Sequence, residues 1–471
     1  MNAYLSYLSH LSPLSRVTGL VKKIQALLIW GALLVAGGVA CYLKHPLLYG
    51  WRRAETPVLL GLAVVAAWLT WRALRALPTW TGRIEPGLRL MACLMVGGLV
   101  VAQEGRFRWQ QYQVEQAGAA MKIIGRHFVV GFRDFAEVAP LAERGLIGGI
   151  YLTRRNLAGQ DTASLRQHID ALQDLRRRAG LAPLFVMADQ EGGEVAHLSP
   201  LIERLPALST LVAQGREGLE ERAYAQGARQ GRDMAALGIN MNLAPVVDLK
   251  PAEKGHWLNL HTLIERRAIA ADPGVVTTVA SAYGAGLQAS GILPTVKHFP
   301  GLGRVQADTH LAKASLTLDA AKQSSDWQPF REVTARTGAA MMLAHVCLTD
   351  IDPEFPASLS RKLVTGVLRK SGDAGWNYQG LLITDDLNML AVYQDGIGRA
   401  ASRALDAGVD LVLVSYDPDQ YYRALHEAAT SWRNGGIDSL REIESAMRLQ
   451  AYWQERGRKE APVSYAELRR N

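Results

Sequence analysis

The first hundred residues contain three stretches without a charged side chain. Residues 24–43 form an apolar run of 20 residues between Lys23 and Lys44. As an α-helix this run would be roughly 30 Å long, which matches the hydrocarbon core of a bilayer. Two shorter runs follow at 58–71 and 90–102. The pattern predicts a membrane anchor in residues 1–106 with up to three transmembrane helices, followed by a linker over 107–123.

Two other interpretations of these runs are less consistent with the sequence. A set of helices buried in a soluble domain is disfavoured, because three runs cluster together and polar residues border each of them. A cleaved signal peptide fits poorly, since the first run is too long and begins too far from the N-terminus.

The distribution of basic residues bears on orientation, because three crossings place the N-terminus and the C-terminal part on opposite sides. The N-terminal tail and second loop carry 7 Lys/Arg, against 6 in the first loop and after the third run. By this margin of one residue, the positive-inside rule favours a cytoplasmic N-terminus. We therefore expect a multi-pass protein of the cell (inner) membrane with its C-terminal domain on the extracytoplasmic side.

From about residue 124, short runs rich in Val and Ile alternate with longer amphipathic stretches. The short runs are 124–132, 147–153, 184–189, 239–248, 292–298, 339–345, 381–385 and 409–415. Helical stretches between them include 162–179, 219–237, 275–290 and 396–407. This alternation predicts an α/β fold with a parallel sheet, and eight units fit a (β/α)8 TIM barrel. An open doubly wound sheet is the alternative, because periodicity does not show closure. Residues 417–471 read as further helices, so the barrel domain would span 124–471.

The formal net charge of +8 belongs to the anchor. Residues 1–106 hold 11 Lys/Arg and 3 Asp/Glu, which leaves 41 of each for residues 107–471. An electroneutral barrel argues against nucleic acid as a partner, and we expect the barrel domain to be monomeric. The chain has no dinucleotide-binding or P-loop signature, and its histidines lack zinc-site spacing, so no metal or organic cofactor is expected.

Polar residues gather at the ends of the predicted strands. They are Asp189, Asp248, Lys297 with His298, His345, and Asp385 with Asp386. In a barrel, the carboxyl ends of the strands form one face, and active sites lie there. A single charged strand end would be explained by a helix cap or an ion pair. Five converging ends favour a functional site, since charged groups at buried strand ends are costly unless they are paired or used.

One of these strand ends carries a long motif. Residues 297–303 read KHFPGLG, and residues 308–310 read DTH. Together they resemble the KHFPGHG…DSH motif of glycoside hydrolase family 3, and more narrowly of its single-domain bacterial β-N-acetylglucosaminidases (β-hexosaminidases), which trim peptidoglycan fragments. Further matches are RN at 155–156, DQEGG at 189–193, NLAPVVD at 242–248, PASLS at 356–360 and ITDDL at 383–387. The resemblance covers about 124–455 and leaves the anchor outside.

The resemblance implies a retaining glycosidase, in which one group attacks the anomeric carbon and another protonates the leaving oxygen. Asp385 matches the nucleophile, and Asp308 and His310 match an acid/base pair. Residues i and i+2 of an extended loop face the same way, so Asp308 could orient the imidazole of His310. Asp386 would point to the other side of the strand, and we expect it to be structural.

The resemblance also implies substrate-binding residues. Asp189, Lys297 and His298 would bind sugar hydroxyls, and Arg267 falls where the family has the arginine of RSFGxDP. A buried pair satisfied inside the barrel mouth is the alternative for Lys297 and His298. The chain departs from the family pattern at Leu302 (His), at Glu194 and His197 (arginines), and at 268–270 (Ser-Phe-Gly). These changes alter the rim, and Glu194 could invert the preference for an anionic leaving group.

The sequence therefore predicts a membrane-tethered retaining exo-β-N-acetylglucosaminidase with two partners, a GlcNAc-containing glycan from the cell wall and the lipid bilayer. A degenerate barrel that binds glycans or serves as a scaffold is one alternative. A family relative with β-glucosidase specificity is the other.

Overall fold

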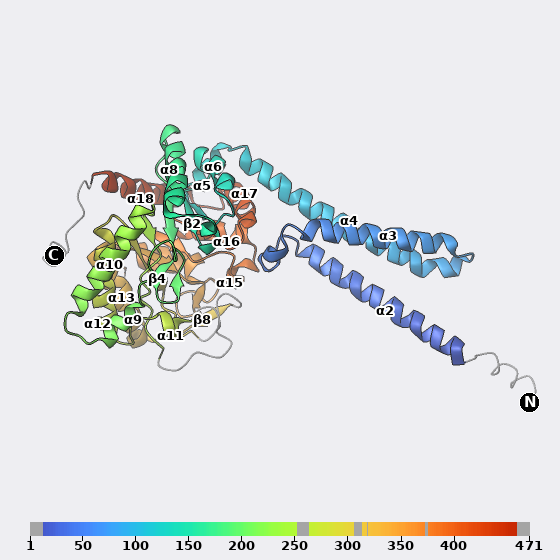
Figure 1. Cartoon of the computed structure of the whole chain (residues 1–471), viewed down its shortest axis with the longest axis horizontal. Helices are drawn as coiled ribbons and strands as arrows, with labels where there is room; N and C mark the ends of the chain where they lie inside the picture. The colour runs from blue at the N-terminus through green and yellow to red at the C-terminus, as the bar shows by residue number, and fades with distance from the viewer. Residues whose placement is uncertain (1–12, 252–262, 306–312, 318, 373–374, 459–471) are drawn as a thin grey trace, which may run out of the picture. The chain divides into compact units, whose positions relative to one another are not determined.

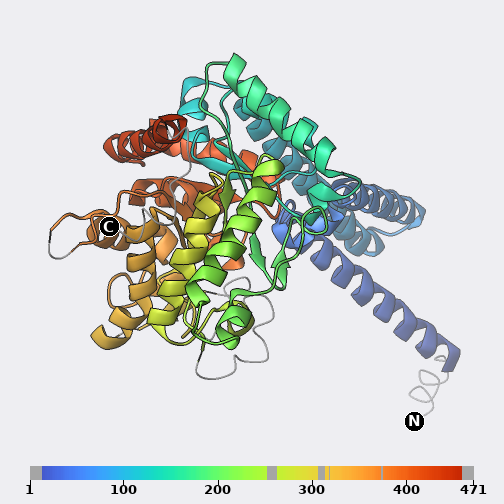
Figure 2. The same cartoon turned by 60° about the vertical axis from the view of Figure 1, so that its left-hand side comes forward.

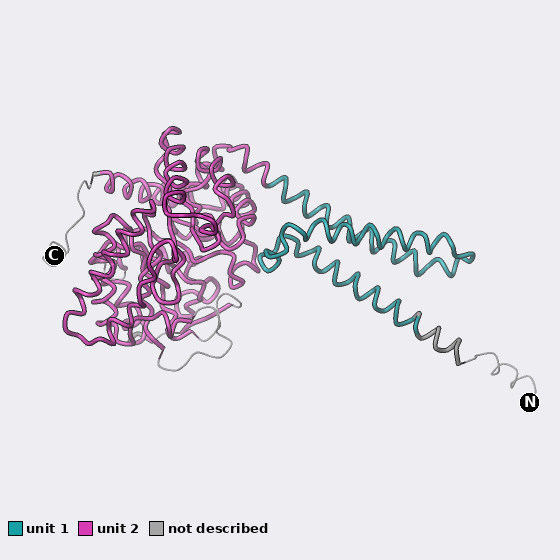
Figure 3. Tube along the Cα trace, in the orientation of Figure 1, with its two compact units in different colours: residues 1–110 teal, residues 111–471 magenta. Residues whose placement is uncertain are grey.

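The computed structural model describes residues 13–251, 263–305, 313–317, 319–372 and 375–458. The chain divides into two compact units, residues 1–110 and residues 111–471 (Figure 3).

Three long helices make up the first unit. They are α2 (Pro13–Cys41), α3 (Glu55–Ala76) and α4 (Trp80–Glu115), with a 3-10 turn η1 (Pro46–Trp51) between α2 and α3 (Figure 1). Each contains a stretch long and apolar enough to cross a membrane, and only 6%, 6% and 17% of these stretches is buried. The apolar side chains of the three helices therefore face outward and do not form the core of a soluble bundle, which is the pattern that a lipid environment favours.

A buried cluster of charges ties the α2–α3 connection to α4. The ammonium of Lys44 lies 3.3 Å from Glu55 Oε1 and 3.0 Å from Glu104 Oε2. Arg52 Nη1 donates to Glu55 Oε1 at 2.7 Å, and Arg108 Nε donates to Glu104 Oε1 at 2.8 Å. Lys44, Arg52 and Arg108 are thus paired with acids within the protein.

The second unit contains an eight-stranded parallel sheet. In spatial order its strands are β11 (Leu382–Thr384), β9 (Ala340–Leu343), β7 (Leu293–Phe299), β6 (Met241–Asn242), β3 (Phe185–Ala188), β2 (Gly149–Leu152), β1 (Phe128–Val130) and β12 (Val412–Val414). A parallel bridge between Ile383 and Leu411 joins the two ends of this order, so the sheet is nearly closed. The barrel-like sheet excludes the open doubly wound alternative.

Helices cover the outside of the sheet. The longer ones are α5 (Ala119–Gly125), α6 (Phe135–Glu143), α8 (Thr162–Arg178), α10 (Leu219–Ala236), α12 (Pro273–Gln288), α13 (Ala320–Thr337), α16 (Ile397–Ala407), α17 (Asp419–Arg433) and α18 (Ser439–Arg458). Figures 1 and 2 show α10, α12 and α13 side by side on the outer surface. The short elements are α7 (Arg154–Leu157), β4 (Gln190–Gly192), β5 (Val195–Ala196), α9 (Leu208–Ala213), α11 (Ile264–Arg267), β8 (Ala314–Leu316), β10 (Val346–Leu348), η2 (Ala357–Leu359), α14 (Arg361–Leu363), η3 (Val364–Arg369) and α15 (Leu390–Tyr393).

Both faces of the sheet are buried, which explains why its strands are almost entirely apolar. Along β1, Phe128 and Val130 pack against the surrounding helices, whereas Val129 packs in the barrel interior. Phe185 of β3 also faces the interior, where its ring lies 4.7 Å from that of Trp453 on α18. Helix α18 therefore contributes to the core at the amino ends of the strands.

Local signals in the sequence set the helix boundaries. Asp161 Oδ1 accepts from the Ser164 N–H at 2.7 Å, and Asp272 Oδ1 accepts from the Val275 N–H at 2.8 Å, so each aspartate caps a helix start. Gly408 ends α16 with φ of 98°, a left-handed conformation that glycine adopts without strain.

All eight predicted strands are present, but two predicted bounds are wrong. Residues 124–125 belong to helix α5, because Met121 and Ile124 are buried at helical spacing. The regular strand β6 ends at Asn242, and Pro245, which lacks an N–H, follows shortly after. Val246 nevertheless continues alongside β7 through a bridge to Lys297.

Candidate active site

Polar side chains from four strands lie at the carboxyl end of the barrel. Asp189 follows β3, Asp248 lies beyond β6, Lys297 and His298 end β7, and Asp385 follows β11. Since parallel strands end on the same face, the predicted strand-end residues within the described ranges share one mouth.

Two acids and two bases form a buried ionic quartet at the centre of this mouth. The Lys297 ammonium contacts Asp189 Oδ1 and lies 2.7 Å from Glu191 Oε1. Arg267 donates two hydrogen bonds to the Glu191 carboxylate, from Nε at 3.0 Å and from Nη2 at 2.7 Å. The Lys297 side chain is only 2% exposed, whereas that of Asp189 is 18% exposed. Asp189 is therefore the member of the Lys297–Asp189 pair that a ligand can reach.

The quartet controls the charge of its acids. Burial alone would raise the pKa of Asp189, but the ammonium of Lys297 outweighs it and holds this pKa well below the ordinary range. Burial also acts on Glu191, and there the charges of Arg267 and Lys297 lower the pKa. Both carboxylates thus remain ionised, and the pairing compensates their desolvation.

His298 is held in one tautomer by its two partners. Its Nδ1–H donates to Asp248 Oδ2 at 2.7 Å, and its Nε2 lies 3.2 Å from Arg267 Nη2. A guanidinium is always a donor, so Nε2 accepts and the ring proton sits on Nδ1. Asp248, which is fully buried, also accepts from the Leu302 N–H at 2.8 Å. The residue at 302 thus supports the site through its backbone, and its buried side chain joins the apolar core.

Tyr151 connects the quartet to His197. Its hydroxyl donates to Asp189 Oδ2 at 2.5 Å and lies 3.2 Å from His197 Nδ1. Burial lowers the pKa of His197, although the Asp189 carboxylate acts in the opposite direction. The sequence analysis missed Tyr151 and Glu191, and it placed Asp248 at a strand end without assigning it a role. A hydroxyl inside the apolar run 147–153 and a second acid in DQEGG were the available signals.

The two adjacent aspartates after β11 have different surroundings. Asp385 is partly buried, and its Oδ1 accepts from the Asp386 N–H at 2.8 Å. Asp386 turns to Ser415 and Tyr416, accepting from Ser415 Oγ at 2.6 Å and from the Tyr416 N–H at 2.8 Å. This contact set fits the structural role expected of Asp386.

Electrostatics connect Asp385 with the quartet. Burial raises the pKa of Tyr151 well above its ordinary value, and the charges of Asp189, Asp386 and Asp385 add to the effect. The Asp385 charge thus acts on the same hydroxyl that donates to Asp189.

Asp308 and His310 lie outside the described residues. Within the described ranges, no group of three His, Cys, Asp or Glu side chains is arranged to hold a metal ion. His345, at the end of β9, instead contacts Ser358 Oγ at 2.7 Å and the Asp386 carbonyl at 3.1 Å, so it braces the loop that carries the aspartates.

Three of the residues that depart from the family pattern differ in their exposure to solvent. Glu194 is exposed and accepts from Arg266 Nη1 at 3.1 Å. Ala268 and Ile269 are buried in the barrel core, where neither offers a polar group to a ligand.

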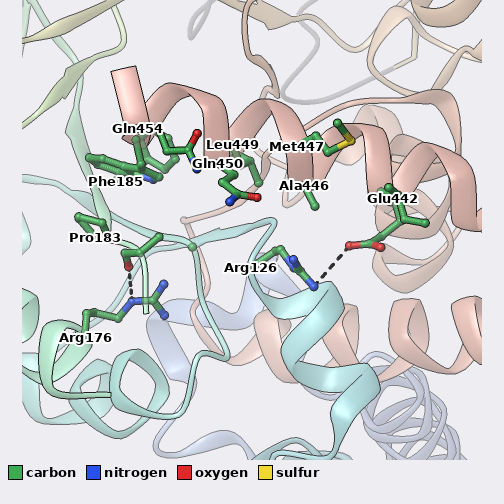
Figure 4. Close-up of a pocket in the computed structure, with 14 residues that line it drawn as sticks. Arg126, Arg176, Pro183, Phe185, Glu442, Ala446, Met447, Leu449, Gln450 and Gln454 are labelled. Atoms are coloured by element: carbon green, nitrogen blue, oxygen red, sulfur yellow. Dashed lines mark hydrogen bonds and ion pairs between the residues drawn. The ribbon is translucent and has the colours of Figure 1, made fainter. Parts of the chain in front are cut away.

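A separate cavity of about 690 Å³ lies at the opposite end of the barrel (Figure 4). It is lined by Pro183 and Phe185 at the start of β3 and by Met447 and Trp453 of α18. The amino ends of barrel strands serve stability, and this cavity contains none of the strand-end acids.

A nearly closed parallel barrel with charged side chains gathered at its carboxyl mouth has the architecture of a TIM-barrel enzyme. A family model described as "Glycosyl hydrolase family 3 N terminal domain" matches residues 113–448. The chain therefore belongs to glycosyl hydrolase family 3, and it is an O-glycosyl hydrolase by family.

Several curated proteins and solved structures are similar to this chain. Beta-hexosaminidase LpqI of Mycobacterium tuberculosis is 33% identical over 287 residues, which cover 60% of this chain and 70% of that protein. Beta-hexosaminidase of Alkalilimnicola ehrlichii is 34% identical over 297 residues, covering 61% and 79%. The family 3 beta-N-acetylglucosaminidase structure from Paenibacillus sp. str. FPU-7 aligns with a TM-score of 0.64 at 31% identity, covering 73% of this chain and 64% of that one.

Proposed function

We propose that this protein is a membrane-tethered, retaining exo-β-N-acetylglucosaminidase that removes terminal β-GlcNAc from cell-wall (peptidoglycan) fragments. The observation that carries the proposal is the position of Asp385, which follows β11 at the mouth that also holds the quartet. The names of the similar β-hexosaminidases support the sugar specificity.

Asp385 is the proposed nucleophile. Its oxygen attacks the anomeric carbon while the bond to the leaving oxygen breaks, which forms a covalent glycosyl-enzyme intermediate. The N–H of Asp386 donates to Asp385 Oδ1 at 2.8 Å, and a hydrogen bond of this kind favours the ionised form that the attack requires. Water then hydrolyses the intermediate with a second inversion, so the anomeric configuration is retained.

His310 and Asp308 are the proposed acid/base pair. The imidazolium of His310 gives its proton to the leaving oxygen, and the neutral ring later takes a proton from the attacking water. This assignment rests on the DTH motif alone.

The quartet and His298 are proposed to bind the sugar. Asp189, its most exposed member, offers a carboxylate oxygen to sugar hydroxyls, while Lys297 and Tyr151 fix its position. Arg267 is 13% exposed and holds His298 in its tautomer through Nη2. Preorganised charges of this kind orient the ring without reorganisation during the reaction.

Hydrolysis of an aryl β-GlcNAc by the full chain in detergent tests the proposal. We expect the wild type to release the phenol and Asp385→Asn to have no activity. An activated fluoro-glycoside should also add one sugar mass to the wild-type protein but none to Asp385→Asn. Saturable glycan binding without hydrolysis would instead favour the non-catalytic barrel, and a higher rate with the aryl glucoside would favour β-glucosidase specificity.

The three apolar helices of the first unit support the proposed anchoring. We propose that they cross the cell membrane and leave the barrel on the extracytoplasmic side, where peptidoglycan lies. A reporter fused after Asn471 that is active only outside the cytoplasm tests the orientation, and activity of a cytoplasm-specific reporter contradicts it.

A further inference from the structure

The turn between α3 and α4 carries exposed arginines beside exposed tryptophans. Arg72 lies over the ring of Trp68 at 5.0 Å, and Arg75 lies over the ring of Trp71 at 4.2 Å. Trp80, at the start of α4, is 81% exposed. Arginine and tryptophan are the side chains typical of a membrane–water interface, since each combines an apolar body with a polar end.

A groove of about 580 Å³ opens between the two helices at this turn. Its apolar walls include Trp71, Trp80, Leu88 and Met91, and Arg75 and Arg83 also line it. The groove therefore combines an apolar channel with two guanidinium groups.

The arginines that line the groove have no acidic partner among the described residues. Arg83 donates only through Nε, to the Leu77 carbonyl at 2.8 Å, so its two terminal nitrogens remain available. The ion pair at this end joins Arg89 to Glu85. By contrast, at the other end of the unit Lys44 and Arg52 are neutralised by Glu55 and Glu104. The two arginines of the groove thus lack the acidic partners that Lys44 and Arg52 have at the other end of the unit.

We infer that this groove binds an anionic phospholipid. Arg75 and Arg83 hold the phosphate of its headgroup, because guanidinium groups form strong, directed hydrogen bonds with phosphate oxygens. One acyl chain lies against Leu88 and Met91, and the tryptophans set the depth of the turn at the interface. The inference rests on the proposed membrane anchoring and not on hydrolase activity.

The bound lipid also bears on orientation. The cytoplasmic leaflet carries the negative surface potential, so a site selective for anionic lipid stabilises the α3–α4 turn on that side. With three crossings, the chain after α4 then emerges on the opposite side, in agreement with the extracytoplasmic barrel proposed above.

The test uses the full chain in nanodiscs and native mass spectrometry. The protein is ejected gently from discs that contain equal amounts of phosphatidylglycerol and phosphatidylcholine. The amounts of the two lipids that remain bound to it are then compared. We expect the wild type to retain phosphatidylglycerol preferentially. In Arg75→Gln/Arg83→Gln the preference should fall by roughly five-fold for each arginine removed.

A matched control is Arg53→Gln/Arg108→Gln, which removes two exposed arginines from the other end of the same unit. It should keep the wild-type preference. Equal retention of the two lipids by the wild type, an unchanged preference in the groove variant, or an equal loss in the control would each overturn the inference. Failure of the wild type to enter nanodiscs would contradict the anchoring itself, and hydrolysis of the aryl substrate reports the barrel independently.

Discussion

Asp385 and Asp386 are adjacent in sequence, yet the hydrogen bonds of their carboxylates come from different parts of the chain. The N–H of Asp386 donates to Asp385 Oδ1 at 2.8 Å, while the Asp386 carboxylate accepts from Ser415 Oγ at 2.6 Å and from the Tyr416 N–H at 2.8 Å. Asp386 thus anchors the chain after β12 and presents its own backbone to the proposed nucleophile.

Exchanging each aspartate for asparagine should separate the two roles. Asp385→Asn should lower kcat by about 10⁴-fold with a small change in stability, because the nucleophile is lost and the shape is kept. Asp386→Asn should destabilise the fold by about 1–3 kcal/mol, since an amide donor would face N–H donors. Rates with an aryl β-GlcNAc and denaturant melts measure both effects. Near-normal turnover by Asp385→Asn would remove Asp385 from the mechanism.

Removing the ammonium of Lys297 from the quartet should lower the stability of the fold. Lys297→Met leaves Asp189 and Glu191 without the ammonium that they share, and breaking a buried pair in this way costs about 3–5 kcal/mol. Chemical denaturation at pH 7 checks the prediction. Lys322→Met serves as the control, because its pair with Asp319 is exposed and should contribute less than about 1 kcal/mol. Similar stabilities for the two variants would contradict the importance of the quartet.

The lowered pKa of Asp189 predicts a pH dependence. A carboxyl whose pKa is lower in the folded state stabilises the fold above its unfolded pKa, which is 3.8. That contribution disappears as the pH falls through the lowered value. The difference in unfolding free energy between wild type and Asp189→Asn should therefore be constant from pH 7 to about 5 and shrink below about pH 4. A difference that grows on acidification would contradict a lowered pKa of Asp189 in the folded state.

Leu302 should matter for packing and not for chemistry. Its side chain is 3% exposed in the barrel core, and its N–H bonds Asp248 whatever the side chain is. Leu302→Ala should cost about 2–5 kcal/mol of stability and leave KM for the aryl substrate within about two-fold. A KM change far above this, with intact stability, would mean that position 302 contacts substrate.

A substitution at Glu194 tests whether this residue affects the preference between anionic and neutral leaving groups. It is exposed and paired only with exposed Arg266 among the contacts described, so Glu194→Arg should change stability by less than about 1 kcal/mol. The variant should raise kcat/KM for a substrate with an anionic leaving group relative to a neutral one, and high salt should reduce the gain. An unchanged ratio would exclude Glu194 as a determinant of this preference.

Much of the fold follows from periodicity along the chain. Each short Val- and Ile-rich run becomes a strand because a parallel sheet buries both faces, and capping residues such as Asp161 and Asp272 mark helix starts locally. These signals lie within a few residues of one another, so they could be identified without the tertiary structure. The predicted bounds of the first and fourth strands were wrong, since helix α5 and Pro245 compete with the strands there.

The sequence by itself determined the order of strands and helices, the three apolar stretches and the strand ends at which acids and bases stand. Only the tertiary structure decided which of these groups meet. The contacts of Lys297 with Asp189 and Glu191, the hydrogen bond of Tyr151 to Asp189 and that of Arg267 to His298 join residues 31 to 108 positions apart. No local pattern encodes such contacts, because they depend on the closing of the sheet, which brings the carboxyl ends of separate strands to one mouth.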